Sequence, residues 1–409
     1  MKIDLNEYLY GLSSLSAYYA LGETPLMKAL MDFLQTVSWE NGGKGGENHP
    51  RMGKILSSYG RIFHILREGG FTGFGDYFWD YCRYSPTLYG KLITEFRWDP
   101  ALENAARNEI DILVSFAQVD CDDVLEWLKD TLPLKYQDVV DGLPRWSSRC
   151  PFDFDSLTMW HKSNGYGIFA KHSFFVWRNG KIYSLPEVET RSYEKLRGYN
   201  LQREQVLENT ARLMGGEGAQ NILLFGDGGT GKSAVVKSMP SVFEQLKLIQ
   251  IEHSSLDTLP QLIGQLGKRT EKFVIFIDDL TFEENDNSYS SLKSVLEGGL
   301  ETPPNNVLVY VTSNRRHLVR HTFSERAGEE VDMTETIIEK TALAQRFGLR
   351  IPYLSMSKEE YLALVAYLLE DKEVEEICPE ELQQKAMMWE IRHGGRTPRV
   401  AEQFVSSLK

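Results

Sequence analysis

A loop that could bind phosphate runs from Gly226 to Ser233, where the sequence reads GDGGTGKS and matches the spacing GxxxxGK[ST]. Glycines let backbone N–H groups turn toward a phosphate, and a helix following the loop directs its positive end at the same anion. Lys232 supplies charge for the β- and γ-phosphates, and the Ser233 hydroxyl is a ligand for Mg²⁺. The predicted contacts to a nucleoside triphosphate, ATP with Mg²⁺, are Gly226, Asp227, Gly228, Gly229, Thr230, Gly231, Lys232, Ser233 and Ala234.

The phosphate-binding loop directly follows a predicted buried strand, NILLF at Asn221 to Phe225. A second apolar run, FVIFIDDL at Phe273 to Leu280, ends in two aspartates. A central parallel strand of this kind delivers carboxylates to the sheet edge where phosphates bind. Asp278 is then the predicted Mg²⁺ ligand, and Asp279 is placed to orient and activate the attacking water. Strands also end in aspartate for turn formation. Glu283 and Glu284 in the next loop could do the work of Asp279 or form a solvated acidic turn.

A third strand is predicted over Asn306 to Thr312, NVLVYVT, shortly before Asn314. A polar side chain at such a strand tip can hold the lytic water or read the γ-phosphate, although Asn314 by itself would be an ordinary turn residue. Further on, Arg346 follows a helical stretch and precedes an apolar strand in ALAQRFGLRI. It is either part of an ion pair within the fold or a finger that stabilises transition-state charge in a neighbouring subunit.

A last arginine, Arg399, begins the amphipathic run near the C-terminus. Thr397 suits the helix cap and Pro398 the first turn, which places Arg399 at the positive end of the helix dipole. A cation is disfavoured there by a few tenths of a kcal/mol up to about 1 kcal/mol. This mismatch suggests that Arg399 binds an anion such as a γ-phosphate.

The elements that must position these residues begin near residue 200. From Ala219 onward apolar strands alternate with amphipathic helices, which predicts an α/β domain. Residues 1–150 are predicted to be mostly helical, with no assignable role. Residues 151–200 are expected to be a connector in which Asn179-Gly180 forms a tight hairpin, with the main domain boundary between 190 and 200.

Composition limits the classes of function. The 409 residues carry a formal net charge of -13, which argues against nonspecific nucleic-acid binding over the whole surface. No window reaches the roughly 18 consecutive apolar residues that cross a bilayer, and the N-terminus lacks the features of a secretory signal. Four cysteines without CxxC pairs favour reduced thiols. We therefore expect a cytoplasmic protein without a membrane segment.

Taken in order, these motifs resemble the AAA+ ATPase superfamily, with Walker A at Gly226–Ser233, Walker B at Phe273–Asp279 and sensor 1 at Asn314. The resemblance implies an arginine finger at Arg346 and a sensor 2 arginine at Arg399. It also implies an α/β fold with a nucleotide-binding domain at residues 201–352, in which a parallel P-loop sheet carries helices on both faces, and a C-terminal helical lid at residues 353–409. Here a mostly helical N-terminal region precedes that fold.

Residues 190–409 contain segments such as GYNLQREQVLENT, FIDDLTFEEND and TSNRRHL, which look like a bacterial AAA+ family catalogued only as a domain of unknown function. AAA+ proteins usually work as rings, often hexamers, with ATP bound between subunits. The resemblance therefore implies a homo-oligomer, with Arg346 reaching the site of the next subunit.

Two features depart from the AAA+ pattern. Most members end Walker B with Asp-Glu, whereas this chain has Asp278-Asp279, and a carboxylate shorter by one methylene, about 1.5 Å, could slow hydrolysis. Related helicase loaders and transposition helper ATPases also carry Asp-Asp. The resemblance therefore implies that the change does not abolish hydrolysis, and it is compatible with slow, switch-like turnover. The stretch from His253 to Thr270 has no aromatic residue, which makes threading of a protein through a central pore less favoured.

Three functions remain open at this stage. The first is an ATP-hydrolysing switch or remodeller, whose unknown macromolecular partner binds the N-terminal region. The second, less favoured, is a nucleic-acid loader or initiator that uses a basic cluster at Arg315, Arg316, His317, Arg320 and His321. The third is an assembly switch that holds ATP and rarely cleaves it.

Overall fold

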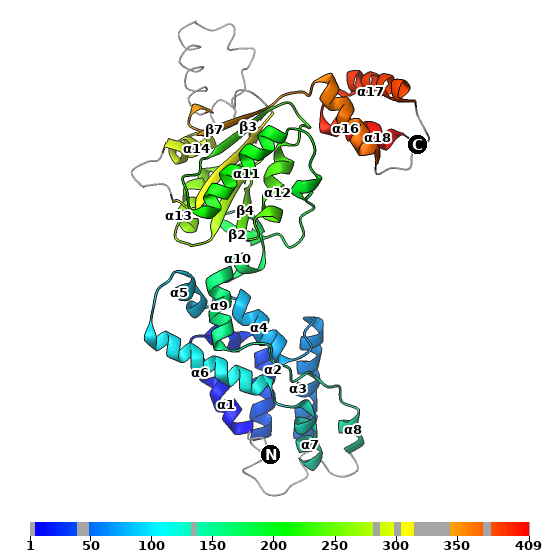
Figure 1. Ribbon diagram of the computed structural model, residues 1–409. Helices are drawn as coiled ribbons and strands as arrows, with labels where there is room; N and C mark the ends of the chain where they lie inside the picture. Colours follow the sequence, from blue (N-terminus) through cyan, green and yellow to red (C-terminus); the bar gives the residue numbers. More distant parts are fainter. Residues whose placement is uncertain are drawn as a thin grey trace. The chain divides into compact units, whose positions relative to one another are not determined.

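The computed structural model shown in Figure 1 describes residues 5–38, 49–131, 137–280, 287–297, 304–314, 344–370 and 378–408. It divides into two compact units, Met1–Lys171 and His172–Lys409. Glu283, Glu284 and the basic cluster at residues 315–321 lie outside the described residues. Within the described residues, no helix is both long and apolar enough to cross a membrane.

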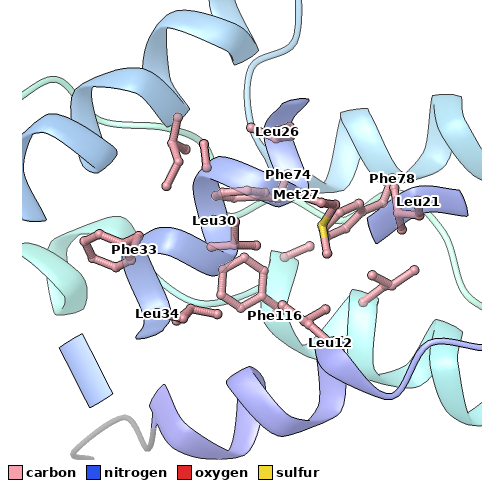
Figure 2. Close-up of a cluster of buried hydrophobic side chains, with 14 of the residues drawn as sticks. Leu12, Leu21, Leu26, Met27, Leu30, Phe33, Leu34, Phe74, Phe78 and Phe116 are labelled. Atoms are coloured by element: carbon pink, nitrogen blue, oxygen red, sulfur yellow. The ribbon is translucent and has the colours of Figure 1, made fainter. Parts of the chain in front are cut away.

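The first unit is helical, as the spacing of its apolar residues predicts. Its α-helices are α1 (Leu5–Ser13), α2 (Pro25–Ser38), α3 (His49–Glu68), α4 (Phe74–Tyr84), α5 (Leu88–Thr94), α6 (Pro100–Ala117), α7 (Cys121–Thr131), α8 (Gln137–Asp141), α9 (Phe154–Asn164) and α10 (Ile168–Lys171). Figure 2 shows the core of this unit, where Leu30 and Leu34 from α2 lie beside Phe116 from α6. Burial of these side chains drives the unit to fold.

One buried carboxylate anchors the segment between α1 and α2. Glu109, on α6, accepts hydrogen bonds from the Ser16 amide at 2.8 Å and hydroxyl at 2.6 Å, and from the amides of Ala17 and Tyr18 at 3.0 and 2.9 Å. A buried carboxylate is tolerated when its lone pairs are filled in this way. Glu109 therefore connects α6 to residues that precede α2.

The second unit contains a seven-stranded sheet in the order β2-β1-β4-β5-β6-β3-β7. The strands are β1 (Phe174–Arg178), β2 (Lys181–Ser184), β3 (Ile222–Gly226), β4 (Leu246–Ile251), β5 (Lys272–Ile277), β6 (Val307–Ser313) and β7 (Leu349–Tyr353). Every neighbouring pair is parallel except β1 with β2. The three strands predicted from apolar runs are β3, β5 and β6.

The hairpin predicted at Asn179-Gly180 is confirmed, since both residues have positive φ, 50° and 73°, between β1 and β2. It belongs to the main sheet, because β1 pairs in parallel with β4 and buries Phe175 and Trp177. The structure thus differs from the predicted connector over residues 151–200. Helices α9 and α10 belong to the first unit, the hairpin belongs to the second, and the boundary falls between Lys171 and His172 rather than at 190–200.

Helices cover both faces of the sheet. On one face α11 (Asn200–Gly215) and α12 (Lys232–Val242) pack against alternate strand residues such as Leu224 and Phe276. The opposite strand residues, including Ile275 and Val311, are also fully buried. Within its described residues this domain also contains the α-helices α13 (Leu259–Leu266) and α14 (Asn287–Glu297). This is the predicted α/β class.

A separate helical core follows β7. It is formed by α16 (Lys358–Glu370), α17 (Pro379–His393) and α18 (Pro398–Ser407). From α16, Tyr361, Leu364 and Val365 pack with Ala386 and Phe404 in one cluster. These three helices constitute the lid.

Candidate nucleotide site

The site lies at the carboxyl edge of the sheet, where β3, β5 and β6 end. Strand β6 pairs in parallel with both β3 and β5. Because parallel strands end at the same edge, the loop after β3, the aspartates after β5 and Asn314 after β6 are brought together.

The phosphate-binding loop starts at a position that only glycine can occupy. Gly226 has φ 132°, and a Cβ added there would lie 2.1 Å from the Tyr353 carbonyl oxygen. The next amide, that of Asp227, donates to the same carbonyl at 2.9 Å. The loop is thus held against β7 at its first residue, before it turns toward the helix N-terminus at Lys232.

The Lys232 ammonium points back into the loop. Nζ donates to the carbonyl oxygens of Gly226 and Asp227 at 3.1 and 2.6 Å, and to Asn314 Oδ1 at 3.0 Å. Burial lowers the pKa of Lys232, and the nearby carboxylates of Asp227, Asp279 and Asp278 oppose that effect. The arrangement keeps a positive charge at the centre of the loop, where a phosphate oxygen could replace a carbonyl as its acceptor.

Ser233 and Asp278 form the second half of the site. Ser233 Oγ donates to Asp278 Oδ1 at 2.5 Å, and the buried Thr312 hydroxyl donates to the same oxygen at 2.7 Å. Lys237 Nζ lies 3.4 Å from the other carboxylate oxygen. A hydroxyl and a carboxylate oxygen this close are hard ligands of the kind that Mg²⁺ prefers. The residues present therefore fit a magnesium ion.

Asp279 and Asn314 are connected directly. Asn314 Nδ2 donates to Asp279 Oδ1 at 2.8 Å, so the Asn314 side chain bridges this carboxylate and the Lys232 ammonium. Asp279 has φ 52°, a left-handed conformation that aspartate tolerates better than most residues. Its amide donates to Thr312 Oγ1 at 2.8 Å. Both aspartates after β5 are therefore oriented by residues of β6 and its end.

The lid contributes the start of α18. Thr397 caps this helix through the Val400 amide, and Pro398 occupies the first turn, as predicted. The Arg399 amide donates to the Gly229 carbonyl at 3.2 Å, which places the first turn of α18 against the loop. From the segment before α11, Arg191 pairs with Glu402 of the same helix.

These groups surround a cavity of about 550 Å³. Of the predicted site residues, those that line it are Gly228, Gly229, Thr230, Gly231, Lys232, Ser233, Ala234, Asp278, Asp279, Asn314 and Arg399. Gly226 and Asp227 shape the loop from behind without lining the cavity. Arg346 follows the short helical stretch before β7 and does not line it either.

Sequence reasoning missed two residues that contact the Asp278 carboxylate, Thr312 and Lys237. Thr312 lies two positions before Asn314, and residues two apart on a strand share one face, so the tip of β6 carried a signal for it. Lys237 lies four positions after Ser233 on α12, which places both on one helical face. Both line the cavity.

A smaller cavity of about 100 Å³ adjoins the first. It is lined by Gly198 and Tyr199 before α11, by Leu364 and Leu368 of the lid, and by residues of the loop including Gly231 and Ala234. The residues that line both cavities are Arg191, Thr230, Gly231, Ala234, Pro398 and Glu402. Basic side chains, those of Lys195, Arg197 and Arg203, also line the smaller cavity. A flat ring joined to a phosphate chain could thus occupy the two cavities together.

A model of the family described as "Protein of unknown function (DUF815)" matches residues 170–409. The chain has no match among curated proteins. Among solved structures, the RuvB Holliday junction branch migration motor of Thermotoga maritima is 17% identical, with a TM-score of 0.34. The match covers 53% of this chain and 63% of the RuvB chain, so this chain spans less than two thirds of the length of RuvB. The FIGL-1 AAA domain in complex with ADP is 18% identical with a TM-score of 0.32, over 55% of this chain and 86% of that one.

Proposed function

The chain belongs to the family described as "Protein of unknown function (DUF815)". We propose that its second unit is an AAA+ P-loop domain with a lid, which hydrolyses ATP to switch or remodel a macromolecular partner. The observation that carries the proposal is the convergence of Lys232, Asn314 and Asp279 through two hydrogen bonds at the wall of the larger cavity. Asn314 thereby holds both the Lys232 ammonium, which would bind phosphate, and the Asp279 carboxylate, which would bind the attacking water.

Each residue has a role in this proposal. The loop amides and Lys232 bind the phosphates of ATP, and Arg399 adds a second positive charge from the lid. Ser233 and Asp278 hold Mg²⁺, which when bound supplies charge neutralisation for the phosphates. Asn314 positions Asp279, whose carboxylate accepts a proton from the attacking water. The adenine base occupies the smaller cavity, which Tyr199 and Leu368 help to line.

The oligomeric part of the proposal rests on Arg346. This arginine does not line the cavity of its own chain, so it would act on a second copy, where it stabilises charge that develops on the transferred phosphoryl group. Such an arrangement makes turnover depend on assembly into a ring. The helical first unit, which is separate from this machinery, is then the part that selects the partner.

A specific observation favours a slow variant of the same function. The Asp279 carboxylate is one methylene shorter than glutamate, and Asn314 already donates to one of its oxygens. Both features reduce its reach and basicity toward water, so the protein would act as an assembly switch with little turnover. For a nucleic-acid loader, the basic residues that would support it lie outside the described part of the chain.

The test is phosphate release by the full chain with ATP and Mg²⁺ over a range of protein concentrations. Lys232→Ala should be inactive because it loses phosphate binding. Arg346→Ala should be inactive because the site of the neighbouring subunit loses the arginine charge. Mixing the two variants should restore part of the activity, because some interfaces combine an intact loop with an intact arginine. Lys181→Ala, an exposed lysine of the β1–β2 hairpin, is the matched control and should behave as wild type.

The outcomes separate the parts of the proposal. Equal phosphate release by wild type and Lys232→Ala would refute hydrolysis at this loop. Inactive mixtures of active-site variants would refute the role of Arg346 in a neighbouring site. ATP binding with a turnover that stays very low in the assembled state would favour the assembly switch.

A further inference from the structure

The phosphate-binding loop contains a carboxylate, Asp227, at its second position. A negative charge there repels the phosphates that the rest of the loop attracts. The side chain is exposed to solvent and does not line the larger cavity. Its contacts lie on the other side of the loop, toward the lid.

The carboxylate of Asp227 binds the connection between β7 and the lid. Oδ2 accepts two hydrogen bonds from Ser355, one from the backbone amide and one from Oγ, both at 2.8 Å. Ser355 lies two residues after the end of β7 at Tyr353 and three before α16 begins at Lys358. Any rotation of the lid relative to the sheet has to be absorbed in this short connection.

The backbone of Asp227 binds the Lys232 ammonium, the group that we expect to bind phosphate. The Asp227 carbonyl accepts from Lys232 Nζ at 2.6 Å, while its amide donates to Tyr353. The contact at the Asp227 carbonyl is one of those that change when a phosphate takes Lys232 as its donor, together with those at the Gly226 carbonyl and Asn314. The side chain of Asp227 holds Ser355, so the change reaches the lid connection within one residue.

A second contact closes the path from the lid back to the loop. The Met356 amide, next to Ser355, donates to the Arg396 carbonyl at 3.0 Å, and three residues later the Arg399 amide donates to Gly229 in the loop. Met356 is itself buried in the lid core. The loop is thus joined to the lid at two points, through Asp227 at the connection and through Gly229 at α18.

We infer that Asp227 is a positioning residue that couples phosphate binding at the loop to the orientation of the lid. Its carboxylate repels phosphate but holds Ser355 through two hydrogen bonds. The inference rests on the proposed function, since it takes ATP as the ligand. It adds a role for a residue that does not line the cavity.

The test measures backbone hydrogen exchange of the full chain with and without saturating ATP and Mg²⁺. In wild type, ATP should slow exchange both in the loop and in α16 and α18. In Asp227→Ala the loop should still respond, whereas the response of the lid helices should fall to less than about half. The affinity for ATP should change by no more than about tenfold, the range expected for two exposed hydrogen bonds.

Three further variants separate charge from contact. Asp227→Asn keeps an oxygen that can accept from Ser355 and removes the negative charge, so it should restore the lid response and bind ATP more tightly. Ser355→Ala removes one of the two hydrogen bonds and should give an intermediate response. Asp257→Ala, an exposed aspartate elsewhere in the same unit, is the control and should match wild type.

Two results would overturn the inference. One is a full lid response in Asp227→Ala, and the other is wild type in which ATP protects the loop but leaves the lid unchanged. A failure of the proposed function has a different signature, because wild type would then show no ATP-dependent protection of the loop at all.

Discussion

Thr312 offers the sharpest test of how the site is built, because one buried hydroxyl serves both aspartates. The hydroxyl donates to Asp278 Oδ1 at 2.7 Å and accepts from the Asp279 amide at 2.8 Å. Replacement by valine keeps the shape of the side chain, which is 1% exposed, and removes both hydrogen bonds. Replacement by serine keeps the hydroxyl and removes only a methyl group.

The expected magnitudes follow from these contacts. A hydrogen bond to a charged group contributes about 1.5–3 kcal/mol, and a buried donor left without a partner costs about 1–3 kcal/mol. Asp278 retains 26% of its side-chain exposure, so water relieves part of the loss. We therefore expect Thr312→Val to lower the free energy of unfolding of the second unit by about 2–3 kcal/mol. Thr312→Ser should cost only about 1 kcal/mol, for the lost methyl group.

The same substitution should act on Mg²⁺ binding. Residues that orient a metal ligand typically contribute 10- to 100-fold to metal affinity. Thr312→Val should therefore raise the Mg²⁺ concentration needed for half-maximal binding of a fluorescent ATP analogue by about tenfold or more. Thr312→Ser should leave it within about twofold, since the oxygen that contacts Asp278 is kept.

Urea unfolding without nucleotide and Mg²⁺ titration at fixed nucleotide measure the two effects separately. The reasoning fails if serine is as destabilising as valine, because the methyl group and not the hydroxyl would then matter. It also fails if the Mg²⁺ midpoint of the valine variant equals that of wild type, since the Asp278 carboxylate would then be oriented without Thr312.

Three other predictions concern single contacts. Gly229 has φ 76°, and an added Cβ would lie 3.0 Å from Arg399 Cβ. Gly229→Ala should therefore weaken ATP binding about tenfold or more in a fluorescence titration. Gly218 has open space around it, so Gly218→Ala is the control and should bind ATP as wild type does. Glu109→Gln should destabilise the first unit by about 2–3 kcal/mol in thermal or urea unfolding, because it removes the charge from a set of buried hydrogen bonds. The control is Glu126→Gln, at an exposed position. Equal stability of the two variants would contradict this prediction. Burial lowers the pKa of His161 below its ordinary value of 6.5, so the unfolded chain binds the proton first and the first unit should lose stability as pH falls below about 6.5. His161→Gln should flatten this dependence between pH 5 and 7 in urea midpoints, and an unchanged slope would assign it to other groups.

Local chemistry made much of the site predictable from the chain alone. The loop at Gly226–Ser233, the hairpin at Asn179-Gly180 and the cap at Thr397 each depend on residues a few positions apart. Glycine conformation, turn formation and helix capping operate over that range. The apolar runs before Asp278 and Asn314 likewise predicted buried strands, and both strands are present.

The tertiary structure alone decided which of these pieces meet. The position of β6 between β3 and β5 brings Thr312 onto Asp278 and Asn314 between Lys232 and Asp279. The order of strands in a parallel sheet depends on crossovers and on packing over both faces, and periodicity along a single strand carries no record of it. The boundary at residue 171 and the contact of Asp227 with Ser355, 128 positions away, are of the same kind. Contacts between distant segments arise only when the whole sheet has formed. The sequence therefore predicts which residues carry the chemistry of the site, but not which hydrogen bonds connect them.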